Sequence, residues 1–206
     1  MLGLLRRNPE AVATYSQALA DIVSRYDLPA FWAGYAVFFQ GWAQWSRGGE
    51  GEIAQMRRGI AIARELGSVA WLTFYKAALA IAEASARERD AGLHCLDDAL
   101  AELEPAEQRS YEAEMHRIRG EILLKRDPTN TAAAEQSLRA AIAVAQSQKA
   151  RSFELRAALS LAKLYRAANR NADAHAAPAP AVEDFLSTKQ FPELTAARAL
   201  LAALSP

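Results

Sequence analysis

Two groups of side chains in this sequence have the types and spacing needed for molecular recognition. The first group is aromatic, with seven aromatic residues between positions 31 and 45. Four of them, Tyr35, Phe38, Trp42 and Trp45, follow +3, +4 and +3 steps, which place them on one face of a helix. A stripe of this kind is either part of a core packed from both sides or a surface that contacts a ligand or partner.

The second group is cationic. Arg156, Lys163 and Arg166 follow +7 and +3 steps, so they also share one face of a helix. Such a face could hold a carboxylate or an acidic peptide through charge-assisted hydrogen bonds. The alternative is an ordinary solvated helix face. Because residues 83–114 are rich in acidic side chains, opposite charges could also meet between neighbouring segments or chains.

Residue patterns typical of catalysis or metal binding are missing from the sequence. It contains neither the phosphate-loop pattern nor the glycine pattern of dinucleotide-binding folds. The run of residues 48–51 lacks a lysine and a preceding strand, and it predicts a plain turn. His94 has Asp97 and Asp98 nearby, which we interpret as a solvated helix end rather than a metal site, and Cys95 as a packing residue. We predict that the protein is not an enzyme and binds no metal or cofactor.

Composition restricts the classes of partner. The formal net charge is zero, which argues against a nucleic-acid binder held by excess positive charge. No run of about 18 apolar residues occurs, so we expect no membrane span. The first residues place two arginines after a short apolar run, the reverse of a secretory signal. With a single cysteine in the chain, these features predict a cytoplasmic protein.

Apolar periodicity predicts helices throughout, with no convincing strand. Gly67 is expected to end one helix as its C-terminal cap, and Pro178 and Pro180 are expected to kink or break another. The predicted helices cover residues 9–25, 29–46, 52–66, 69–87, 91–103, 107–125, 132–148, 152–169, 173–188 and 192–204.

The predicted helices form pairs that repeat about every 40 residues. A small residue lies in the middle of each first helix, where it would let the second helix approach closely; these residues are Gly41, Ala80, Gly120 and Ala162. The second helices carry triplets at +4 and +3 spacing: Ala54, Arg58, Ala61; Gly92, Leu96, Ala99; Ala134, Leu138, Ala141; Ala174, Pro178, Ala181. A two-helix repeat of this length is typical of an α-solenoid.

We therefore predict an all-α superhelix in one domain, residues 1–206. It would consist of an N-terminal helix (1–27), which looks like the second half of an incomplete repeat, four helix pairs (28–67, 68–105, 106–149 and 150–190) and a C-terminal capping helix (191–206).

The small residue followed by the alanine-rich triplet resembles tetratricopeptide repeats. The segments at 28–43, 53–67, 111–124 and 150–166 also resemble the C-terminal repeat region of bacterial multidomain signalling proteins, in which a nucleotide cyclase or DNA-binding domain precedes an AAA-type ATPase and such repeats. None of the catalytic motifs of those proteins occurs in this chain. The resemblance implies that first helices line a concave groove, with side chains that include Glu114, Glu121 and Lys125. The predicted partner-binding set is Tyr35, Phe38, Trp42, Trp45, Phe74, Ile81, Arg117, Arg156, Lys163 and Arg166.

We therefore expect a non-catalytic scaffold that binds a protein segment, a peptide or a sister domain, as a regulatory module of a bacterial signalling protein. One alternative is a domain that senses a small ligand and controls an attached cyclase or ATPase. The other alternative is an oligomerisation unit, in which the chain would form a homo-oligomer.

Overall fold

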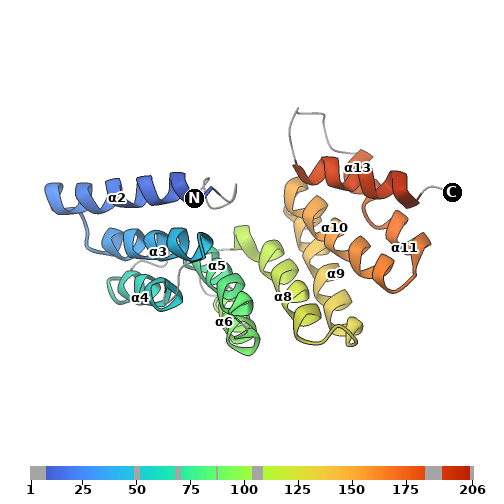
Figure 1. The fold of residues 1–206 in the computed structure, drawn as a ribbon, viewed down its shortest axis with the longest axis horizontal. Helices are drawn as coiled ribbons and strands as arrows, with labels where there is room; N and C mark the ends of the chain where they lie inside the picture. The colour runs from blue at the N-terminus through green and yellow to red at the C-terminus, as the bar shows by residue number, and fades with distance from the viewer. Residues whose placement is uncertain are drawn as a thin grey trace. The chain divides into compact units, whose positions relative to one another are not determined.

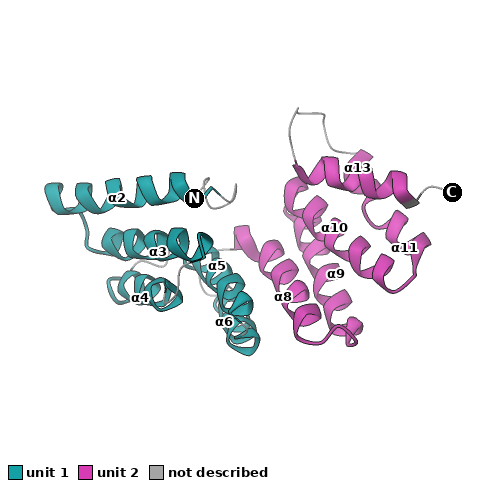
Figure 2. Cartoon of the chain, in the orientation of Figure 1, with its two compact units in different colours: residues 1–108 teal, residues 109–206 magenta. Residues whose placement is uncertain are grey.

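The computed structural model describes residues 8–48, 52–67, 71–86, 88–103, 109–183 and 192–204. Every regular element within these ranges is helical, and none of these residues forms a strand (Figure 1). The all-α prediction is therefore confirmed. The helices cluster into two compact units, residues 1–108 and 109–206 (Figure 2), whereas the sequence predicted one continuous domain. The boundary falls close to the predicted junction between the second and third helix pairs.

Unit 1 contains α2 (Pro9–Tyr26), α3 (Phe31–Ser46), α4 (Glu52–Glu65), α5 (Leu72–Ser85) and α6 (Arg89–Ala101). Each helix packs against the next one along the chain, and α3 also contacts α5. The side chain of Asn8 caps α2 by accepting a hydrogen bond from the Ala11 amide at 3.0 Å. Gly67 has a positive φ of 78°, which confirms the left-handed cap expected after α4.

Unit 2 begins with a 3-10 turn, η1 (Arg109–Tyr111), followed by α8 (Glu112–Arg126), α9 (Thr131–Ser147) and α10 (Arg151–Ala167). The short helices α11 (Asn171–Ala176) and α12 (Ala179–Glu183) come next, and α13 (Pro192–Leu204) is the last. The break between α11 and α12 falls at Pro178, as the sequence predicted; residues 184–188 of that predicted helix lie outside the described residues. Helix α10 contacts α8, α9, α11, α12 and α13, so it is central to this unit.

The small residues predicted in the first helices lie where helices approach closely. A Cβ atom added to Gly41 would lie 2.9 Å from the Glu52 carbonyl oxygen on α4. A Cβ atom on Gly92 would lie 2.8 Å from the Ala80 carbonyl oxygen, and one on Gly120 would lie 2.8 Å from Cγ of Leu138. The side chain of Ala162 is fully buried. The proposed packing role of these positions is confirmed.

The triplets of the second helices mark the buried face in α6, α9 and the α11–α12 segment, but not in α4. Ala54, Arg58 and Ala61 are exposed. The buried face of α4 instead carries Met56, Gly59 and Ala63. The buried face is therefore shifted by one to two residues from the triplet along this helix. Arg58 stays on the exposed face because moving its guanidinium from water to a position between two helices would cost free energy.

Candidate functional site

The aromatic stripe of α3 lies mainly inside unit 1. Tyr35, Phe38 and Trp42 are at most 5% exposed, and Phe74 on α5 is equally buried. The rings of Tyr35 and Phe38 contact the ring of Tyr75, with centroids 4.8 and 4.7 Å away. Trp45 and Ile81 are half-buried. The structure thus places four aromatic members of the predicted partner-binding set in the core, where Tyr75 joins α3 to α5: Tyr35, Phe38, Trp42 and Phe74.

Unit 1 also buries a carboxylate between helices. Glu83 on α5 is 3% exposed, and its Oε1 accepts a hydrogen bond from Nε of Arg57 on α4 at 3.0 Å. The other oxygen, Oε2, has no hydrogen-bond partner among the described residues. Burial raises the pKa of Glu83, and the nearby Arg57 only partly offsets that effect. Arg57 also binds Glu88 at 2.6 Å, so one arginine of α4 binds both α5 and the residue that precedes α6.

This carboxylate should give unit 1 a distinctive pH dependence. Because the pKa of Glu83 is higher in the folded state than in the unfolded state, its contribution favours folding at low pH. That contribution is lost as the pH rises through the folded-state pKa. We expect Glu83→Gln, measured by urea unfolding, to differ most from the wild type at pH 7, where the variant is more stable. The difference should shrink as the pH falls through the window between the two pKa values. A constant difference across pH 4–7 would contradict this assignment.

A second charged network lies inside unit 2, on the facing sides of α8 and α10. Arg117 is 5% exposed and Glu114 is 1% exposed. Nε and Nη2 of Arg117 donate to the two carboxylate oxygens of Glu114 at 2.8 and 2.7 Å, a bidentate pair. Nη1 of Arg117 donates to Oε1 of Glu121, one helical turn further along α8. One buried guanidinium therefore compensates two carboxylates of the same helix.

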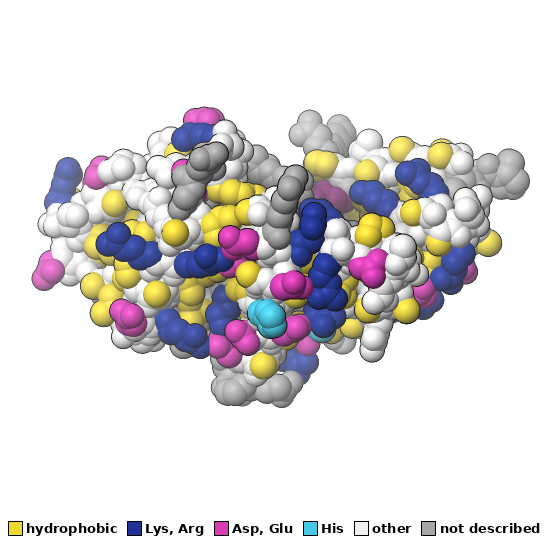
Figure 3. Space-filling model, turned by 60° about the horizontal axis from the view of Figure 1, so that its bottom comes forward, with side chains coloured by type: hydrophobic (Ala, Val, Ile, Leu, Met, Phe, Trp, Pro, Cys, Tyr) yellow, Lys and Arg dark blue, Asp and Glu magenta, His cyan; other side chains and the backbone are white. Residues whose placement is uncertain are grey.

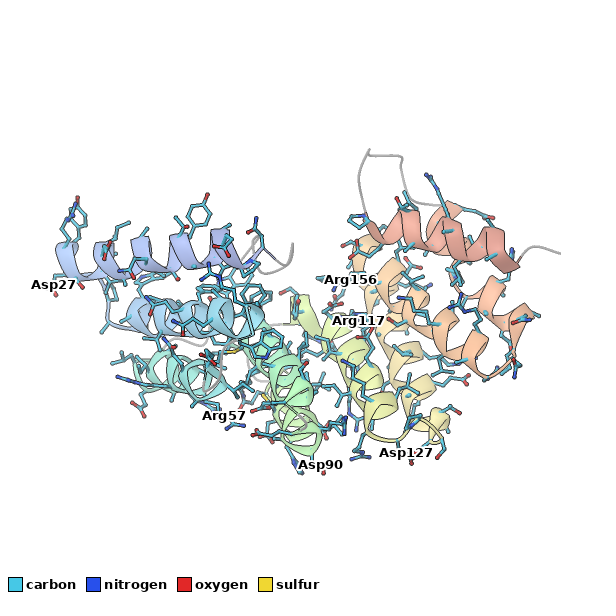
Figure 4. The ribbon with its side chains drawn as sticks, viewed as in Figure 1. Asp27, Arg57, Asp90, Arg117, Asp127 and Arg156 are labelled. Carbon is cyan, nitrogen blue, oxygen red and sulfur yellow. The ribbon has the colours of Figure 1, made fainter. Side chains whose placement is uncertain are left out.

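Helix α10 completes this network from the other side. Nη2 of Arg156 lies 2.8 Å from Oε1 of Glu114, and Figure 4 shows Arg117 and Arg156 close together between α8 and α10. Nε of Arg156 lies 3.7 Å from Glu193 on α13. Arg156 was predicted to face a partner, but the structure uses it as an internal ion-pair member. The general expectation that opposite charges meet between neighbouring segments is confirmed.

The network ends at a groove of about 420 Å³ formed by α8, the start of α9 and α10. Glu121 lines this groove, and Ser160 on α10 donates a hydrogen bond to Oε1 of Glu121 at 2.7 Å. Burial alone would raise the pKa of Glu121, but the charge of Arg117 and the Ser160 hydrogen bond outweigh it, and the pKa lies below its usual value. The apolar part of the lining is formed by Leu124, Pro128, Leu164, Ala167 and Ala168.

Two lysines also line this groove. Lys125 lies one turn after Glu121 on α8, and Lys163 lies on α10; both are exposed. Neither forms an ion pair with any residue that the structure describes. Arg166, the third member of the predicted cationic face, is likewise exposed and unpaired among the described residues, but it does not line the groove. The structure thus brings Lys163 together with Lys125 and separates both from Arg156.

Sequence reasoning missed the residues that shape the groove. Ser160 was not singled out, although its position four residues after Arg156 places it on the same face of α10. Pro128 was assigned only to the break between two predicted helices, and Thr131 was not singled out. Their position near Lys125 could have been predicted from the sequence. The turn that joins the two helices of a pair lies beside the last turn of the first helix, and that last turn contains Lys125.

A second concave site in unit 2 already has its polar groups paired. This hollow of about 340 Å³ is lined by residues of α9, α10 and α11, including Arg139 and Tyr165. The Tyr165 hydroxyl donates to Glu135 and accepts from Arg139, each at 2.7 Å. The guanidinium of Arg170 lies 4.1 Å from the centre of the Tyr165 ring. These polar groups bind one another, and we interpret them as contacts that stabilise the packing of the helices. The α8–α10 groove is therefore the stronger candidate for a binding site.

The described residues contain no group of three or more histidine, cysteine or acidic side chains that could hold a metal ion. Burial raises the pKa of the Cys95 thiol to about 12, so this thiol stays protonated at neutral pH.

Acidic and basic side chains are interspersed on the face shown in Figure 3. No described helix is long and apolar enough to cross a lipid bilayer.

Comparison with known proteins finds a similar segment in a much longer protein. An uncharacterised protein of Rhizobium meliloti (strain 1021) is 30% identical to this chain over 156 residues. The matched segment covers 75% of this chain but spans only 15% of the relative. No protein-family model matches the chain, and no solved structure matches it.

Proposed function

We propose that this protein is a non-catalytic helical-repeat scaffold whose groove between α8 and α10 binds a protein segment that carries a carboxylate beside an apolar side chain. The observation that carries this proposal is an imbalance of charge at the end of the buried network. Each carboxylate from Glu114 to Glu121 is compensated by Arg117 or Arg156. Lys125 and Lys163, beyond Glu121, form no ion pair with a described residue, although Lys125 is close enough to Glu121 to help lower its pKa.

The shape and lining of the groove agree with such a ligand. Two neighbouring cations repel each other, and a carboxylate placed between them would relieve that repulsion while gaining charge-assisted hydrogen bonds. Leu124 and Leu164 lie in the same groove and offer an apolar surface. A ligand with both features would gain affinity from apolar contact and orientation from the lysines.

The scaffold itself would be an α-solenoid resembling tetratricopeptide repeats. Its support is the recurrence of one packing scheme in both units: a small residue in a first helix lies against the second helix of its pair, as at Gly41 and Gly120. The match to a short part of a much longer relative supports a role as a regulatory module within larger proteins. The partner would then be a peptide segment or a sister domain.

Charge reversal at both lysines, Lys125→Glu with Lys163→Glu, should weaken this binding. The probe is a short peptide, Ser-Gly-Ser-Ala-Leu with a free C-terminal carboxylate, titrated by calorimetry at low salt. We expect the double variant to lose about tenfold or more in affinity, because two attractive charges become repulsive. Its unfolding midpoint should stay close to the wild-type value, since both side chains are exposed and unpaired among the described residues.

The matched control is Lys149→Glu, which reverses an exposed lysine outside the groove. It should bind the peptide like the wild type. Equal binding by the wild type and the double variant would contradict the proposed site. A wild-type protein that binds the carboxylate peptide no better than its C-terminal amide would contradict the role of the lysines.

A small-ligand sensor is the second candidate, favoured by the volume of the groove. About 420 Å³ lies within the range of small-molecule sites. In that case a free apolar carboxylate, such as 4-methylpentanoate, should bind as tightly as the peptide.

A further inference from the structure

Helix α2 of unit 1 carries apolar side chains that face solvent. Tyr15, Ile22 and Tyr26 are 73%, 45% and 64% exposed. No other large apolar side chain in the described ranges is as exposed as the two tyrosines. The +7 and +4 spacing of the three residues places them on one face of the helix, and the exposed Ala18 lies on the same face. We call these four residues the α2 stripe.

The α2 stripe is not the face by which α2 packs within unit 1. The buried residues of this helix are Val12 and Ser16, and its main contacts are with α3. Figure 1 shows α2 at the edge of unit 1, with α3 along one side. Exposed apolar side chains gathered on one face of an edge helix are typical of a surface that binds a partner.

We propose that the α2 stripe binds the same stripe of a second copy of this chain, with the two α2 helices antiparallel. A contact about a two-fold axis requires a face that matches itself when it is reversed. Tyr15 of one copy would lie opposite Tyr26 of the other copy. Ala18 would lie opposite Ile22, and both pairs have their midpoint close to Ala20. Aromatic rings would thus meet at both ends, while a small residue would face a larger one in the middle.

The charges on α2 agree with this pairing. The four residues of the α2 stripe are uncharged. The carboxylate of Asp21 accepts a hydrogen bond from Gln17 at 3.0 Å on its own helix. Arg25 is exposed and directly precedes Tyr26, so it would lie beside the ring of Tyr15 in the other copy. A guanidinium is attracted to the face of an aromatic ring.

The area of the contact predicts a weak dimer. With the exposed fractions of Tyr15 and Tyr26, the four tyrosines of two copies would remove about 550 Å² from water if each side chain offers about 200 Å². Ile22 and Ala18 add less than this. The total therefore stays below about 1,200 Å², in the range of transient complexes. We expect monomer and dimer to exchange rapidly.

Sedimentation velocity of the full chain over a range of concentrations tests this dimer. The weight-average mass of the wild type should rise from that of a monomer toward that of a dimer, and no further. Tyr15→Glu and Tyr26→Lys should each weaken association about tenfold or more, since a charge replaces an aromatic contact. The matched control is Leu66→Glu, because Leu66 is 49% exposed and follows α4. It should associate like the wild type.

Mixing the two α2 variants tests the antiparallel arrangement. In a mixed dimer, the glutamate introduced at position 15 would face the lysine introduced at position 26 of the other copy. The two remaining tyrosines, Tyr26 and Tyr15, would meet at the other end. The mixture should therefore associate about tenfold more tightly than either variant alone. In a parallel pair each position would face itself, and mixing would restore nothing.

Circular dichroism should give the same helix content for all variants, because the replaced side chains are exposed. A wild-type chain that stays monomeric at every concentration would overturn the proposal, and the α2 stripe would then belong to another partner. A Tyr15→Glu variant that associates as tightly as the wild type would also overturn it. Weakened single variants without recovery on mixing would exclude the antiparallel arrangement. Each outcome is independent of the groove in unit 2, which is tested with a peptide.

Discussion

Arg117→Ala is expected to destabilise unit 2 by about 3–5 kcal/mol, the range measured when one partner of a buried ion pair is removed. The variant would leave Glu114, which is 1% exposed, with Arg156 as its remaining cation. It would also release Glu121. The bidentate geometry makes the loss large, because two hydrogen bonds to a buried carboxylate disappear together with the charge.

Urea unfolding followed by circular dichroism measures this effect, and hydrogen exchange of the α8 amides locates it. The matched control is Arg166→Ala, which truncates an exposed arginine that has no ion pair among the described residues. Its free energy of unfolding should change by no more than about 0.5 kcal/mol. Equal midpoints for the two variants would show that the Glu114–Arg117 pair contributes nothing to the fold.

Gly59→Ala is expected to destabilise unit 1 by about 3 kcal/mol, the upper part of the range for overpacking. A Cβ atom at this position would lie 2.5 Å from the Phe38 nitrogen and 2.6 Å from the Gly34 carbonyl oxygen. Both are backbone atoms of α3, so α3 and α4 must separate to admit the methyl group. The intrinsic preference of helices for alanine over glycine, about 1 kcal/mol, is too small to offset this.

Tryptophan fluorescence reports on this change, since all four tryptophans lie between positions 32 and 71. Gly120→Ala in unit 2 is the variant used for comparison, and its unfolding is followed by circular dichroism. Its nearest neighbour is the side chain of Leu138, which can turn away, so we expect a change within about 1 kcal/mol of zero. A Gly59→Ala protein as stable as the wild type would mean that α3 and α4 are not in close contact at this point.

Most helices and their packing positions were predictable because apolar periodicity and small residues are local features of a sequence. Pro192 and Leu204 bound the last helix as predicted, and Pro178 interrupts the preceding one. In α4 the alanine triplet does not mark the buried face, and the reason is physical. Ala54 and Ala61 match the alanine spacing of the other second helices, but the face that packs is chosen by Met56 and Gly59 together with the residues opposite them on α3.

The candidate site was only partly predictable. Lys163 and Glu121 were expected to face a common surface, and both line the groove. Arg156 could not be separated from Lys163 by spacing, because only the three-dimensional position of Glu114 and Glu193 decides which cation is neutralised. The burial of Tyr35 and Phe38 likewise depends on Tyr75, which lies about 40 residues away in the chain.

The break at Pro178 leaves α11 and α12 with six and five residues, too few to persist as isolated helices in water. Their folded state depends on neighbours that cover them, and Leu194, Ala197 and Leu200 of α13 share a buried cluster with Ala181 and with Leu155 of α10. We therefore expect helix α13 and the two short helices to fold as one cooperative unit. Local opening would release all three together, and their amide protons should exchange with solvent at a common rate.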